Sequence, residues 1–196
     1  MTTSPLTAYF DTLPGTLLIT DNQGVVLYAN AAIEGRTGYS VGEIVGKKAG
    51  MLWGRRMEPA FYGELWETIK KKKQPFVSFV SNVRKNKMMQ GEELHIAPVL
   101  DDHSETKYFL EIQPGVQKPE ARHFFSHLFL ARFREQYRKP HGMVSCIAEW
   151  MGGSGERETG HSFIDSIEQE LIAPMGERFH ERINDLECIR TAKEHP

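Results

Sequence analysis

Residues 17–47, "LLITDNQGVVLYANAAIEGRTGYSVGEIVGK", decide the fold, because two short apolar runs here enclose a polar turn. The runs at residues 16–20 and 25–29 predict two strands, and the DNQG between them is typical of a hairpin turn. Asn30 follows the second strand and is predicted to cap a short helix. Ser40, with Glu43 three positions later, has the spacing of a capping box and predicts the start of another helix.

Periodic segments continue beyond this hairpin. Residues 58–72 predict a longer helix, with Phe61, Leu65 and Ile69 four positions apart. Three further strands are predicted, at residues 76–84, 88–100 and 107–113. This order of elements predicts the α+β class: a five-stranded antiparallel sheet with short helices on one face.

Composition sets the outer limits of the interpretation. A chain of 196 residues with 40% hydrophobic content suits a packed domain with an appendage, and a net charge of -2 gives no footprint for nucleic acid. Cys146 and Cys188 are far apart, which indicates neither a disulfide framework nor a zinc site and suits a reducing compartment. Since no apolar run approaches the roughly 20 residues of a membrane span, we expect a cytoplasmic protein without membrane contact.

Two segments together resemble a known family. Residues 17–47 are similar to the opening of a PAS domain, and residues 82–99, "NVRKNKMMQGEELHIAPV", are similar to its closing hairpin. PAS domains are sensor modules whose sheet and helices enclose a pocket that holds a cofactor, a metabolite or nothing. They pass the state of the pocket to a C-terminal helix. The resemblance implies a PAS fold and a sensor domain over residues 1–116.

Asn82 lies where the strand "FVSFVSNVRKNK", residues 76–87, becomes basic. On a period of two it shares a face with Val80 and Phe76. The pattern leaves three roles open for its amide: the first solvated position of the strand, a polar group directed into an apolar space, or a turn residue that bonds its own backbone.

The resemblance also implies a cofactor. In the flavin-binding LOV branch, an asparagine in an N-x-R-K segment and a glutamine near the end of the last strand bond the flavin ring, and Asn82 and Gln113 stand at these places. Ala49 replaces the reactive LOV cysteine, so adduct photochemistry is not expected. Trp66, in "FYGELWETI", is similar to a tryptophan of redox-sensing PAS domains like those of nitrogen-fixation regulators, which favours FAD. FMN, another small molecule and an empty pocket stay open as alternatives.

Each of these residues also has a purely structural interpretation, and haem has little support. Trp66 suits core packing on an amphipathic helix, and Gln113 could mark the last exposed position of the sheet. Haem-binding relatives place a histidine on the long helix. Residues 58–72 contain none, so no haem is expected.

The C-terminal third predicts helices. Residues 117–150 have an aromatic stripe that predicts an output and dimerisation helix, and hence a homodimer. Part of it resembles a degraded phosphoacceptor helix of sensor histidine kinases, with Glu135 at the histidine position, so kinase activity is not expected. Residues 151–160 form a linker by composition. Residues 161–196 form a helical tail, with Ile167 and Leu171 at helical spacing, that either folds onto the sensor or bundles between two subunits.

The sequence therefore predicts a non-enzymatic sensor of the kind used in two-component signalling, which relays a redox or ligand signal to a separate downstream protein. It contains no recognisable catalytic triad, metal cluster or phosphate loop. The alternative is a ligand-free PAS module that serves protein–protein interaction and dimerisation.

Overall fold

The computed structural model describes residues 5–52, 54–101, 103–113, 165 and 167–174. Its elements, in chain order, are α1 (Pro5–Asp11), β1 (Thr16–Asp21), β2 (Val26–Ala29), α2 (Ala32–Thr37), α3 (Val41–Ile44), α4 (Ala49–Leu52), α5 (Pro59–Trp66), the π-helical turn η1 (Glu67–Lys71), β3 (Phe76–Val83), β4 (Met89–Leu100), β5 (Thr106–Gln113) and the π-helical turn η3 (Ile167–Ile172). Within these ranges no helix is long and apolar enough to cross a bilayer. The predictions for residues 117–160 fall outside them.

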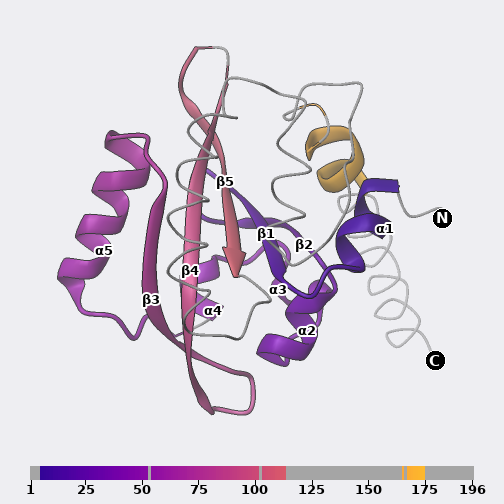
Figure 1. Ribbon diagram of the computed structural model, residues 1–196, viewed down its shortest axis with the longest axis horizontal. Coiled ribbons are helices and arrows are strands. Elements are labelled where there is room, and N and C mark those ends of the chain that lie inside the picture. Colours follow the sequence, from indigo (N-terminus) through magenta and orange to yellow (C-terminus); the bar gives the residue numbers. More distant parts are fainter. Residues whose placement is uncertain (1–4, 53, 102, 114–164, 166, 175–196) are drawn as a thin grey trace, which may run out of the picture.

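The strands form one five-stranded antiparallel sheet in the order β2-β1-β5-β4-β3 (Figure 1). The predicted α+β class and the five strands are confirmed. The last strand, β5, lies in the centre of the sheet, where Glu111 stands opposite Leu18 on β1 and Ile96 on β4. A side chain on β5 is thus flanked by other strands on both sides, which limits its access to water.

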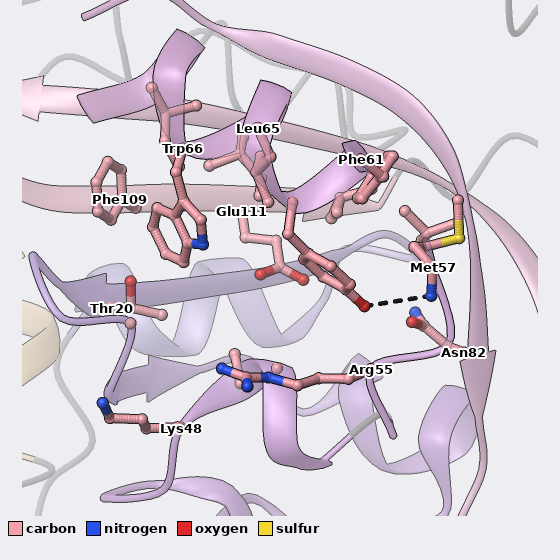
Figure 2. Close-up of a pocket in the computed structure, with 18 of the residues that line it drawn as sticks. Thr20, Lys48, Arg55, Met57, Phe61, Leu65, Trp66, Asn82, Phe109 and Glu111 are labelled. Atoms are coloured by element: carbon pink, nitrogen blue, oxygen red, sulfur yellow. Dashed lines mark hydrogen bonds between the residues drawn. The ribbon is translucent and has the colours of Figure 1, made fainter. Parts of the chain in front are cut away.

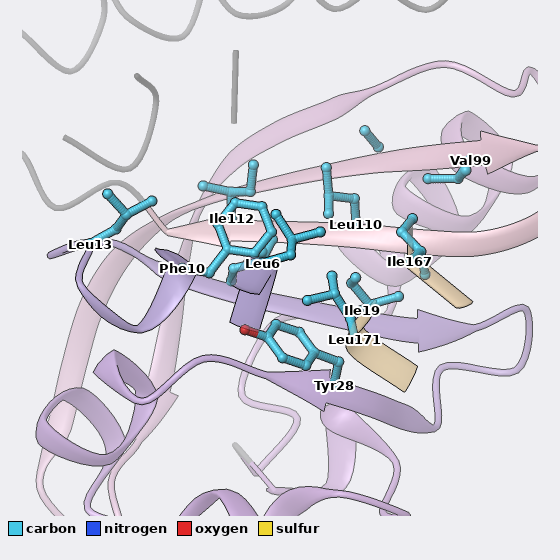
Figure 3. Packing of buried hydrophobic residues seen from close by; sticks show 12 residues of the cluster. Leu6, Phe10, Leu13, Ile19, Tyr28, Val99, Leu110, Ile112, Ile167 and Leu171 are labelled. Carbon is cyan, nitrogen blue, oxygen red and sulfur yellow. The ribbon is translucent and has the colours of Figure 1, made fainter. Parts of the chain in front are cut away.

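Alternation along the strands creates two buried faces. On one face, α2 to α5 cover the sheet, as predicted, and Phe109 of β5 packs with Leu65 and Ile69. On the other, Leu110 and Ile112 of β5 pack against α1 and η3 (Figure 3). Helical elements therefore cover both faces, and the central strand contributes side chains to each.

The segment η3 comes from far along the chain and packs beside α1. Ile167 and Leu171, predicted to share a helical face, are both buried in the cluster drawn in Figure 3. The Thr7 hydroxyl donates to the Glu170 carbonyl oxygen at 3.0 Å, and the Tyr108 hydroxyl donates to Glu168 Oε1 at 2.8 Å. Part of the tail thus folds onto the sensor sheet.

Asn30 corrects one prediction from the sequence. Asn30 does not cap α2. The N-cap position of α2 is Ala31, and no side chain caps this helix. The Asn30 amide is fully buried: its oxygen accepts from the Leu17 N–H at 2.8 Å, and its nitrogen donates to the carbonyl oxygens of Phe10 and Gly15 at 2.9 and 3.0 Å. It therefore joins α1 to β1, because these buried backbone groups need partners.

The other predicted helix start is confirmed. At the beginning of α3, the Ser40 N–H donates to a Glu43 carboxylate oxygen at 2.9 Å. The carboxylate also pairs with Lys85 on the β3–β4 turn, and these contacts lower the pKa of Glu43 to about 2. The ion pair between Glu43 and Lys85 thus joins α3 to the β3–β4 hairpin.

Candidate ligand-binding site

A cavity of about 680 Å³ lies between the sheet and the helices α4, α5 and η1. Its size falls within the range of small-molecule pockets. Its inner walls are largely apolar, and four of the side chains that form them are aromatic; the wall residues are Phe61, Tyr62, Leu65, Trp66, Ile69, Val80, Leu94, Ile96 and Phe109. Such walls suit a flat ring system more than a polar metabolite.

Cationic side chains gather at the rim of the cavity. Lys48, Arg55, Arg56 and Lys70 line it and are exposed to solvent. Figure 2 shows Arg55 reaching across the pocket from the segment that links α4 to α5, with Lys48 near its other edge. Four positive charges beside an apolar interior favour a ligand with an aromatic ring and an anionic tail.

Glu111 brings a carboxyl group into this apolar interior. Its side chain projects from β5 into the pocket between Trp66 and Asn82 (Figure 2). Burial, and then the negative charge of Glu92, raise its pKa to about 7. No hydrogen bond reaches this carboxyl group from the described residues, so it presents an unused polar group to whatever occupies the pocket.

Glu92 is buried on β4 and joins three elements. The Arg36 Nε of α2 donates to Glu92 Oε1 at 3.0 Å, and the Asn82 Nδ2 of β3 donates to Glu92 Oε2 at 3.2 Å. Arg36 Nη1 also donates to the Gln113 carbonyl oxygen at 3.3 Å, at the end of β5. A polar network thus runs from the pocket wall to the end of the sensor sheet.

The sequence profile of the family described as "PAS domain" matches residues 14–113, which is just over half of the 196 residues. The chain belongs to the PAS domain family. The match begins just before β1 and ends with β5, so it spans the whole sheet together with the helices that enclose the pocket.

Two proteins with similar sequences are named as a regulator and as a light-activated kinase. The nitrogen fixation regulatory protein of Klebsiella oxytoca is 27% identical over 98 residues, covering 50% of this chain and 20% of that protein. The blue-light-activated histidine kinase of Brucella anthropi is 28% identical over 116 residues, covering 58% and 23%. The chain spans only about a fifth of the length of these relatives. The expected resemblance to a nitrogen fixation regulator and to a blue-light-activated kinase is thereby confirmed.

A solved structure agrees on the fold. The PAS domain of a protein from Colwellia psychrerythraea superposes with a TM-score of 0.51 at 18% identity, covering 56% of this chain and 92% of that one. At this identity the likeness concerns the architecture alone.

The PAS pocket brings together two of the three predicted site residues. Asn82 and Trp66 both line the cavity, whereas Gln113 does not. The centroids of the Trp66 and Phe109 rings lie 6.0 Å apart. Lys70 Nζ lies 4.6 Å from the centroid of the Trp66 ring. Gln113 is 1% exposed, so it is not a solvated sheet end, and its Oε1 accepts from the Thr16 hydroxyl at 3.0 Å.

The structure also decides between the roles considered for Asn82. Asn82 lies within β3, and its amide is on the side of the sheet that the helices cover, where it bonds Glu92. It is thus a polar group in a largely apolar wall. The turn bond belongs to Asn86, whose Oδ1 accepts from the Met88 N–H at 3.0 Å. Ala49, which the resemblance places where LOV domains carry their cysteine, is buried and lines the same cavity.

Reasoning from the sequence missed two acidic residues: Glu111, which lines the pocket, and Glu92, which lies beside it and bonds Asn82. One signal was available for Glu111: a carboxylate stands between Leu110 and Ile112 in an otherwise apolar strand. The partners of Glu92 could not be found in this way, because Arg36 and Glu92 lie 56 residues apart.

Proposed function

We propose that this PAS domain is a redox sensor that binds a flavin nucleotide, with FAD as the first candidate, in the pocket beside Trp66 and Asn82. The observation that carries the proposal is the division of the cavity into an apolar interior with four aromatic side chains and a cationic rim. Such a cavity fits a ring that carries a phosphate-containing tail. When bound, a flavin supplies a ring that can take up electrons and a proton.

The polar groups of the pocket fit the edge of such a ring. A flavin edge alternates hydrogen-bond donors and acceptors, and the Asn82 amide can offer either. The Glu111 carboxyl adds a group that donates when neutral and accepts when ionised. Because both groups are set in apolar walls, their bonds to a ligand are little weakened by water.

Redox sensing is favoured over adduct photochemistry. Ala49 lies in the pocket at the position that the resemblance assigns to the LOV cysteine, and the described residues that line the cavity include no cysteine. One relative is named a nitrogen fixation regulatory protein and matches at 27% identity, which supports a regulatory role for this chain.

The output path begins at the end of β5. Arg36 joins Glu92 beside the pocket to the carbonyl oxygen of Gln113, the last residue of β5, which lies four positions before the segment predicted as output helix. A changed charge or hydrogen bond at the pocket would alter this link, and the signal would pass to a downstream protein. Homodimerisation, the lack of enzymatic activity and a cytoplasmic location remain predictions of this proposal.

An absorption spectrum tests the proposal. The protein would be purified, and a second sample would be unfolded and refolded with excess FAD or FMN before free flavin is removed. We expect bands at about 370 and about 450 nm to remain with the protein. A protein that retains no flavin after refolding would contradict flavin binding.

The ligand-free interaction module is the second candidate, and exposed apolar side chains favour it. Phe79, Met88 and Met89 are 59%, 61% and 64% exposed on the edge strand β3 and its hairpin with β4. Exposed apolar groups on an edge strand are typical of contact surfaces. This candidate predicts that the refolded protein carries no flavin bands.

A further inference from the structure

Glu111 is a carboxyl group with an unusual set of neighbours. Across the strands it stands opposite Leu18 and Ile96, and along β5 Phe109 shares its face of the sheet. Its side chain is directed into the cavity rather than toward a partner on the sheet (Figure 2). The open side of the carboxyl group is therefore the space that a ligand would fill.

Burial and one acidic neighbour favour the neutral form of Glu111. Glu92 on β4, which is paired with Arg36 of α2, adds negative charge that raises the pKa of Glu111. The remaining ionisable groups that line the cavity are Lys48, Arg55 and Arg56 around α4, Tyr62 on α5 and Lys70 on η1. The pKa of Glu111 stays raised to about 7 despite these cations, since burial is the largest cause.

A ring ligand would increase this preference. A neutral ring placed over Glu111 removes the remaining water from its carboxyl group, and an ionised carboxylate without a cationic partner is costly to bury. A neutral carboxyl group has an O–H that can donate to a ring nitrogen or carbonyl oxygen. The complex is thus favoured when Glu111 carries its proton.

We propose that Glu111 is a ligand-binding residue whose protonation controls occupancy of the pocket, so that a flavin ring binds when Glu111 is neutral and is released when it ionises. This inference rests on the proposed flavin function and assigns pH regulation to the same site. Because the carboxyl group titrates near neutrality, modest changes of pH would change the fraction of protein that holds the ligand.

The test is a titration of ligand-free protein with riboflavin and with FAD, followed by quenching of flavin fluorescence. Riboflavin has no phosphate, so its binding reports the ring alone. With a titration midpoint near pH 7, wild-type Kd should be about tenfold higher at about pH 8 than at about pH 6. Glu111→Gln, which stays neutral, should give Kd values within about twofold at both pH values.

Two further variants sharpen the result. Glu64→Gln removes the same charge from an exposed position of α5 outside the cavity, and it should keep the wild-type pH dependence. Glu92→Gln removes the neighbouring negative charge and should move the midpoint to lower pH. Circular dichroism checks that each variant is folded.

The outcomes separate the two proposals. Flavin that binds wild-type protein equally well at both pH values, or a folded Glu111→Gln variant that keeps the wild-type slope, would overturn the role of Glu111 and leave flavin binding intact. Failure of riboflavin and FAD to bind wild-type protein at about pH 6 would overturn flavin binding, and the role of Glu111 with it.

Discussion

Asn82 Nδ2 lies 3.2 Å from Glu92 Oε2, and this bond joins the wall of the pocket to a buried ion pair with Arg36. Asn82 is therefore placed to contact both a ligand and the network that reaches the end of β5. Any ligand that changes the bonding of the amide also changes the surroundings of a buried carboxylate.

Replacement of Asn82 by alanine tests its contact with the ligand. We expect the flavin absorption bands or the flavin reduction potential of Asn82→Ala to differ from those of the wild type, because a polar group at the ring edge is lost. Asn86→Ala removes an amide from the exposed β3–β4 turn and serves as the control. A flavin spectrum and potential unchanged in Asn82→Ala would remove Asn82 from the site.

The buried ion pair should matter for stability. Arg36→Met keeps an apolar stem but leaves the buried Glu92 side chain, which is 4% exposed, without the cation of its ion pair. We expect the free energy of unfolding in urea to fall by about 2–4 kcal/mol. Lys71→Met breaks an exposed ion pair with Glu67 and should leave stability nearly unchanged. Similar losses in the two variants would contradict the importance of burial.

Glu111 should also make stability depend on pH without any ligand. The pKa of Glu111 is about 7 in the folded protein, against an ordinary value of 4.5 for the unfolded chain. Between these pH values the folded protein holds a proton that the unfolded chain releases. The contribution of Glu111 to stability is therefore fully present below the lower value and is lost as pH rises through the higher, a change on the order of 3 kcal/mol.

The comparison with Glu111→Gln isolates this contribution. His95 has a pKa lowered by burial, and its effect runs in the opposite direction, because its stabilisation grows as pH rises. Since both proteins contain His95, its effect cancels in the difference between their unfolding free energies. A difference that does not vary between about pH 4.5 and about pH 7 would contradict the raised pKa.

The cationic rim should recognise phosphate. Arg55→Ala and Arg56→Ala should each weaken FAD binding by about three- to tenfold and leave riboflavin binding unchanged, because only FAD carries phosphate groups. Lys47→Ala removes a cation beside the pocket but outside its lining and is the matched control. Equal losses for riboflavin and FAD would indicate a structural role for the arginines.

Asn30 is predicted to be a stability residue. Asn30→Ala leaves the Leu17 N–H and the carbonyl oxygens of Phe10 and Gly15 without their side-chain partner, so the free energy of unfolding should fall by about 2–4 kcal/mol. Asn22→Ala, in the exposed β1–β2 turn, should stay within about 0.5 kcal/mol of the wild type. Equal effects would contradict the bonding of Asn30.

The strands could be predicted because local patterns determine them. Alternating apolar residues and turn signals placed β3 and β5 within a residue or so of their observed bounds. The same local reasoning failed for Asn30: an asparagine before a helix fits a cap, and nothing nearby indicates that Phe10 and Gly15 require its amide. Its partners are set by tertiary packing.

The site was only partly predictable for the same reason. Asn82 and Trp66 were found through short motifs, and both line the cavity. The pairing of Arg36 with Glu92 depends on how α2 folds over the sheet, which no spacing along the chain encodes. Gln113 lies on the expected strand, yet its side chain bonds Thr16 outside the cavity lining.

Titration of ligand-free wild-type protein with FAD at about pH 6 tests the central claim most directly. The account predicts quenching of flavin fluorescence that saturates at one FAD per chain. Flavin fluorescence that shows no saturable change, in protein shown by circular dichroism to be folded, would contradict the claim that this pocket holds a flavin.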